Sequence, residues 1–129
     1  MTTLSRTVFG NTPDMADDLL SLVLSGRKTA TCWAAVHGDE GARVGQRVVV
    51  ADGRDRDAAI IETLQLDMRR FDQVDEEWAF AEGEGDRTLH YWQRVHEAFF
   101  RGQGVFAPDM ALWCERFRLV QVLDRETAQ

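Results

Sequence analysis

The stretch Leu24-Ser25-Gly26-Arg27-Lys28-Thr29-Ala30-Thr31 predicts the point at which a helix gives way to a strand. Upstream of it, apolar residues recur at helical spacing, and Thr12 followed by proline is typical of a helix start. Gly26 suits the left-handed conformation that often ends a helix. We therefore expect a helix over residues 13–25, then a strand over residues 28–33 because threonine favours extended backbone.

Further strand and helix patterns follow along the chain. The predicted elements are strands over 47–51, 58–68 and 112–123, a helix over 72–82, and a last helix that Asp86 caps and that ends near Gly102. Alternation at Leu64, Leu66 and Met68 indicates one buried face on the strand that contains them. This order of elements predicts a single α+β domain over residues 1–129, with a curved sheet or small barrel and helices packed outside.

Composition and charge exclude several classes of protein. The formal net charge is −7, and binding duplex DNA needs many cations against phosphates, so we expect no duplex DNA partner. A pocket for one nucleotide or a short single strand is compatible with this charge. The longest apolar cluster, over residues 19–24, is too short to span a membrane.

The cysteines and histidines carry no recognised metal or disulfide pattern. Cys32 and Cys114 are far apart and form no CxxC pair, so we expect two reduced thiols in a cytoplasmic protein. The three histidines lack ligand spacing to a cysteine or carboxylate, and no dinucleotide or phosphate-loop motif is present. The sequence therefore predicts neither a metal site nor a cofactor.

Lys28 is the main candidate for chemistry because it is the only lysine, the other fourteen cations being arginine. A partly buried lysine can lose its proton and act as a base, whereas arginine cannot. The alternative is a surface lysine near the end of a helix, where a cation is favourable. Thr31 follows three residues later, and a lysine beside a hydroxyl can form an activated nucleophile.

Other candidate residues are less certain from local sequence alone. Glu84 lies between two glycines, which lets the backbone place its carboxylate freely, although local sequence by itself favours a solvated carboxylate in a turn. Glu82 is its close competitor. Trp33 can stack on a base or pack in the core, and we expect it, with Arg27, to contact substrate.

Three stretches give the chain a resemblance to a known family: Leu24 to Thr31, then Phe80-Ala81-Glu82-Gly83-Glu84-Gly85-Asp86-Arg87-Thr88-Leu89-His90-Tyr91-Trp92, and finally Cys114-Glu115-Arg116-Phe117. Their order and spacing resemble the ASCH domain family, whose members have a PUA-like β-barrel fold and are associated with RNA. With the intervening strands, the resemblance covers nearly the whole chain. It implies a PUA-like β-barrel with helices packed outside.

Some ASCH members are amidohydrolases that remove acyl groups from the exocyclic amine of acylated cytidines. The resemblance assigns their catalytic lysine, threonine and glutamate to Lys28, Thr31 and Glu84, with Glu82 as the fallback for the glutamate. It implies that a neutral Lys28 takes the proton of Thr31, which attacks the amide. Trp33 stands where those members have arginine.

The leading functional prediction is thus an amidohydrolase acting on an acylated nucleoside. A second class is a non-catalytic module that binds a nucleotide or short single-stranded RNA in the same cleft. A third, a ribonuclease, ranks last because the sequence shows neither a histidine pair nor a metal-binding carboxylate cluster.

Overall fold

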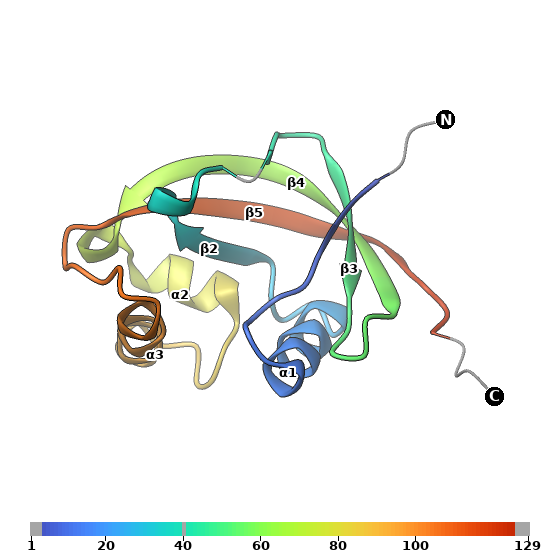
Figure 1. The fold of residues 1–129 in the computed structure, drawn as a ribbon, viewed down its shortest axis with the longest axis horizontal. Coiled ribbons are helices and arrows are strands. Elements are labelled where there is room, and N and C mark those ends of the chain that lie inside the picture. The colour runs from blue at the N-terminus through green and yellow to red at the C-terminus, as the bar shows by residue number, and fades with distance from the viewer. Residues whose placement is uncertain (1–3, 40, 126–129) are drawn as a thin grey trace.

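The computed structural model describes residues 4–39 and 41–125 (Figure 1). Its elements, in chain order, are β1 (Ser5–Thr7), α1 (Pro13–Leu24), β2 (Ala30–Ala34), β3 (Arg47–Ala51), β4 (Asp57–Arg70), α2 (Glu76–Glu82), α3 (Leu89–Gly102) and β5 (Ala111–Val122), with short 3-10 turns η1 (Ala35–His37) and η2 (Phe71–Gln73). The sequence predicts that the tail over residues 124–129 frays, since it has no apolar anchor, and its residues from 126 onward lie outside the described part of the chain.

The five strands form one curved sheet in the order β1-β3-β4-β5-β2. Strands β1 and β3 are parallel, and the other neighbours are antiparallel. The three helices lie on one side of the arch that β4 and β5 form (Figure 1). The α+β prediction is confirmed, but the predicted barrel is not closed, because β1 and β2 remain the two edges of the sheet. A strand as short as β1, with three residues, offers little edge for closure.

Local sequence predicts helix α1 correctly. Thr12 caps it by accepting a hydrogen bond from the Met15 amide at 3.1 Å, and Pro13 occupies the first turn. Gly26 has a φ of +81°, as expected for the residue after a helix end. The element ends at Leu24, within one residue of the prediction.

The later helices require corrections. Thr88, and not Asp86, caps α3 by accepting from the Tyr91 amide, while Asp86 accepts hydrogen bonds from the Thr88 amide and hydroxyl. Arg87 has a φ of 67°, which is incompatible with a helix that starts at this position. The helix predicted over 72–82 is divided into η2 and α2, and Asp75 caps α2.

The predicted buried face of β4 is also wrong at its second half. The pairing of β4 with β5 shifts register between Thr63 and Gln65, which leaves Leu64 as an extra residue. Such a bulge exchanges the two faces of the strand. Leu64 and Met68 are consequently exposed, at 48% and 54%, whereas Thr63 is buried.

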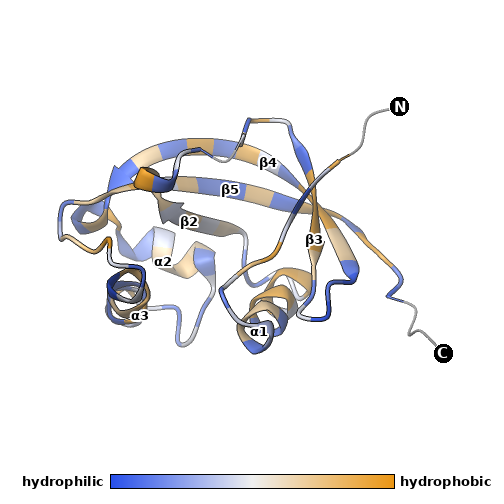
Figure 2. Ribbon diagram, in the orientation of Figure 1, coloured by the Kyte–Doolittle hydropathy of each residue, from blue (hydrophilic) through white to orange (hydrophobic). Residues whose placement is uncertain are grey.

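Two hydrophobic clusters make up the core. One joins α2 and α3 to β2 and β5 around Trp78, Trp92 and Leu112, and the other joins α1 to the sheet around Leu20 and Phe117. Hydrophobic residues accordingly dominate α1, while hydrophobic and hydrophilic residues alternate along β4 and β5 (Figure 2). Within the described residues, every helix is too short or too polar to cross a membrane.

Candidate functional site

The segment between α1 and β2 crosses directly beside the end of α2. The Thr29 amide donates to the Ala81 carbonyl at 2.8 Å. Gly83 then turns the chain with a φ of +76°, and a Cβ at this position would clash with the carbonyl of Arg27. Glycine is therefore required here, and the close approach brings the side chains of Glu82 and Glu84 to Lys28.

Lys28 is buried, with 2% of its surface exposed. Its Nζ donates to Glu84 Oε2 at 2.9 Å and lies 3.5 Å from Glu82 Oε1. Burial lowers the pKa of Lys28, but the charges of Glu82 and Glu84 outweigh it, so the pKa is raised above its ordinary value. The side chain is thus an ammonium ion at neutral pH, contrary to the expectation of a neutral lysine base in the resting protein.

Glu82 is the second buried charge of the site. Trp78 Nε1 donates to its Oε2 at 2.7 Å, and His96 Nε2 lies 3.4 Å from its Oε1. Burial opposes ionisation, yet Lys28 and His96 together hold the pKa of Glu82 far below its usual range. Glu82 therefore remains a carboxylate that is fixed between the Lys28 ammonium and the His96 ring.

His96 is held in one orientation by Trp92. Its Nδ1 lies 2.8 Å from the Trp92 carbonyl, and its ring stacks on the Trp92 indole with centroids 4.2 Å apart. Burial lowers the pKa of His96, while the neighbouring Glu82 raises it, and the net direction is upward. His96 thus packs on Trp92 and faces the buried carboxylate of Glu82.

These groups line a cavity of about 690 Å³ between α1 and α3. Lys28, Thr31 and Glu84 all border it, so the structure brings the three predicted catalytic residues to one place. Lys28 precedes β2, whereas Thr31 lies within it, and both border this cavity. The walls are mainly apolar and aromatic, from Phe9, Met15, Leu19, Tyr91, Val95 and Phe99.

Arg27 and Trp33, the predicted substrate contacts, are not among the residues that line this cavity. The Arg27 guanidinium donates to the carbonyls of Gly83 and Gly85, at 2.8 and 2.6 Å, and so fixes the loop that carries Glu84. Trp33 Nε1 donates to the Gly38 carbonyl, and its ring borders a neighbouring hollow of about 300 Å³. Thr31 borders both spaces.

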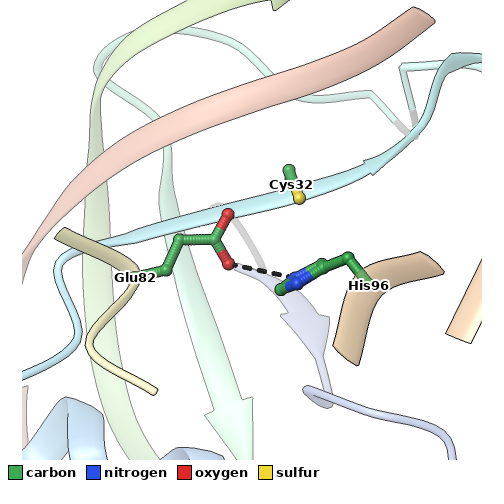
Figure 3. Close-up of side chains that lie close together, drawn as sticks. All are labelled: Cys32, Glu82 and His96. Atoms are coloured by element: carbon green, nitrogen blue, oxygen red, sulfur yellow. Dashed lines mark ion pairs between the residues drawn. The ribbon is translucent and has the colours of Figure 1, made fainter. Parts of the chain in front are cut away.

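The structure also assembles a group that sequence reasoning missed. Cys32, Glu82 and His96 come from β2, α2 and α3, and each offers one possible ligand atom, all within 4.8 Å of one another (Figure 3). Burial and the Glu82 charge raise the pKa of Cys32 well above its usual value, so the thiol is neutral. Positions so far apart in the chain give no spacing signal, and only the fold brings them together.

The fold and the site together define an ASCH domain. The family model described as "ASCH domain" matches residues 5–121. The chain belongs to this family, as its three motif stretches indicated.

Two solved structures resemble this chain over most of its length. The ASCH domain from Lactobacillus crispatus JV V101 is 31% identical with a TM-score of 0.82, over 92% of this chain and 80% of that one. A protein from Enterococcus faecalis V583, assigned to the family model DUF984, is 35% identical with a TM-score of 0.83, over 95% and 79%. No curated protein matches the chain.

Proposed function

We propose that this ASCH domain is an amidohydrolase that removes the acyl group of an acylated nucleoside, of the acylated cytidine type. One observation carries the proposal: Lys28, Thr31 and Glu84 border the same cavity, and the lysine is paired with the glutamate. The cavity, at about 690 Å³, has the size of a small-molecule site. The free thiols of Cys32 and Cys114 are in keeping with the cytoplasmic location that we expect for such an enzyme.

The contacts of Lys28 support a division of roles that differs from the sequence expectation. Because Lys28 is already protonated, it cannot take the proton of Thr31, and we assign that role to the carboxylate of Glu84, which borders the same cavity as Thr31. Lys28 orients that carboxylate and supplies positive charge to the oxyanion that forms on the substrate carbonyl.

The reaction follows in two balanced steps. Thr31 Oγ1 forms a bond to the amide carbonyl carbon while its proton passes to Glu84, and the C–N bond then breaks as Glu84 protonates the departing amine. Water next attacks the acylated Thr31, gives its proton to Glu84, and releases the acid as the hydroxyl is restored. Neither step consumes a cofactor.

The cavity lining supports a free nucleoside over a phosphorylated one. Tyr91 and Phe99 offer aromatic surface for stacking a base. Asp18, Glu82 and Glu84 contribute carboxylates, while Lys28 already pairs with two of them. A phosphate would therefore meet mostly negative charge in this cavity.

The proposal is tested by hydrolysis of a panel of acylated cytidines and simple aryl amides. We expect turnover by the wild type, and a loss of about 10³-fold or more in Thr31→Ala because its nucleophile is gone. Thr29→Ala is the matched control, since the Thr29 hydroxyl bonds to the Ala81 carbonyl and is not part of the cavity lining. Full activity in Thr31→Ala would refute the mechanism.

A second candidate function is binding of a nucleotide or short single-stranded RNA without turnover. The same aromatic walls favour it. It predicts saturable binding of cytidine by calorimetry, with the ligand recovered unchanged. Absence of turnover with every amide of the panel, together with such binding, would select this candidate.

A further inference from the structure

The geometry around His96 points to a second feature at the floor of the cavity: we propose that Cys32, Glu82 and His96 form a site for a divalent transition metal, of which Zn²⁺ is the best match. The three side chains come from three different elements and converge within 4.8 Å (Figure 3). A thiolate, an imidazole and a carboxylate are the usual zinc ligands. This site goes beyond the proposed hydrolysis and does not depend on it.

The hydrogen bonds of His96 leave one ring nitrogen available. Nδ1 faces the Trp92 carbonyl at 2.8 Å, so it must carry a proton and donate it. Histidines that bind metals are commonly held in this way, with one nitrogen donating to a carbonyl and the other directed to the ion. Nε2 is therefore the atom that faces Glu82.

Glu82 has the corresponding arrangement. Trp78 Nε1 donates to Oε2 at 2.7 Å and fixes the carboxylate, and Oε1 lies between His96 Nε2 at 3.4 Å and Lys28 Nζ at 3.5 Å. Both side chains are nearly or fully buried, with 12% and 1% of their surfaces exposed. His96 and Glu82 thus each have an outer partner of the kind that orients metal ligands.

The separation of the two atoms fits a metal ion better than a shared proton. A charge-assisted hydrogen bond between imidazolium and carboxylate spans about 2.7 to 2.9 Å, whereas His96 Nε2 and Glu82 Oε1 lie 3.4 Å apart. Two ligand atoms each about 2.1 Å from a tetrahedral ion are separated by about 3.4 Å. The observed gap therefore equals one edge of a tetrahedral zinc site, with Cys32 as the third ligand.

Charge around the site is compatible with a divalent ion. When Zn²⁺ binds, the Cys32 thiol gives up its proton to solvent. The carboxylates of Glu82 and Glu84 and the Cys32 thiolate then balance the ion and the Lys28 ammonium. All three ligands border the cavity, so the fourth position is open to water or to a ligand in it.

Cobalt titration tests this site without any substrate. Protein freed of metal with a chelator is titrated with Co²⁺, whose thiolate complexes absorb strongly in the near ultraviolet. We expect one equivalent to bind with a thiolate-to-cobalt band, and one equivalent of Zn²⁺ to remove that band. No band, or no saturation at one equivalent, in the unmodified protein would overturn the proposal.

The second cysteine provides a matched control. Cys114 lies opposite Cys32 in the pairing of β2 with β5, but it is not part of the cluster. Cys32→Ser should lose the thiolate band. His96→Gln removes a ligand, so it should weaken cobalt binding by more than the loss of an outer partner does, which is about 10- to 100-fold. Cys114→Ser should keep both band and affinity. If Cys114→Ser loses the band and Cys32→Ser keeps it, the assignment of Cys32 as a ligand is refuted.

A further variant separates this site from the proposed hydrolysis. Lys28→Met removes the ammonium of the candidate active site but no metal ligand. It should abolish amide turnover and retain the cobalt band. If it loses the band, the cluster does not bind metal independently, and the assignment of ligands is wrong.

Discussion

Replacement of Lys28 by methionine should lower the free energy of unfolding by about 3 to 5 kcal/mol at neutral pH, because breaking a buried ion pair strands its partners. The Lys28 side chain is 1% exposed, and its ammonium contacts Glu84 and Glu82 at 2.9 and 3.5 Å. Without it, two carboxylates lose their shared cation, and Glu82, also 1% exposed, keeps only the His96 ring beside it. Because the side chains of Lys28 and Glu82 are almost fully shielded from solvent, solvent screens the loss little.

Urea unfolding of metal-free protein at pH 7, followed by circular dichroism and tryptophan fluorescence, measures this loss. A domain of this size has a total stability of about 5 to 15 kcal/mol, so the variant should stay folded enough to analyse. Adding Glu84→Gln to Lys28→Met should recover part of the loss, since one of the two stranded charges is then removed. Arg101→Met is the control, because its partner Glu97 and Arg101 itself are both exposed. If the free energy of unfolding of Lys28→Met alone lies within about 1 kcal/mol of wild type, the buried network is refuted.

Three further predictions concern other parts of the molecule. Asp52 accepts from the Arg54 and Arg56 amides, which with its arginine partners lowers its pKa to about 2 although burial opposes this. The stabilising effect of its carboxylate is present above the unfolded pKa of about 4 and is lost as pH falls toward 2. Asp52→Asn should therefore lower the free energy of unfolding by about 2 kcal/mol at pH 7 and by almost nothing near pH 2, as measured by urea unfolding at both pH values. An equal loss at both pH values would contradict the pKa shift. Gly83→Ala should lower the free energy of unfolding by about 2 kcal/mol or more, because φ is +76° and the new Cβ meets the Arg27 carbonyl. Gly102→Ala, where the space around the new Cβ is open, should not destabilise the protein. Burial raises the pKa of the Cys114 thiol to about 12. Iodoacetamide at pH 8 should therefore alkylate Cys114 only after unfolding, which mass spectrometry of the digested protein will show. Rapid labelling of Cys114 in the native protein would disprove this.

Much of the fold is accessible from local sequence because its causes are local. Thr12 and Gly26 determine the limits of α1, since a cap and a left-handed residue act within one turn of the chain. The short strand β1 was missed, because three residues carry no periodicity and are held by pairing to the distant β3. The bulge at Leu64 was missed for the same kind of reason, since it depends on register with β5.

The same distinction between local and distant causes applies to the candidate site. Lys28, Thr31 and Glu84 could be selected from residue type, local glycines and family resemblance. The protonation of Lys28 could not, because it depends on Glu82 and Glu84, more than fifty positions away in the chain. Arg27 shows another limit of local sequence, since an arginine beside a candidate site suggests a substrate contact, whereas its hydrogen bonds to the carbonyls of Gly83 and Gly85 depend on the tertiary structure.

The amino-acid sequence by itself therefore determined the class of fold, the main helices and strands, and the family, because these rest on periodicity, caps and motif order along the chain. Tertiary structure alone decided which charges are buried together, and hence that Lys28 is a cation. It also decided that Cys32, Glu82 and His96 meet. The physical reason is that electrostatic interaction depends on distance through space and on exclusion of water, and neither quantity can be deduced from separation along the chain.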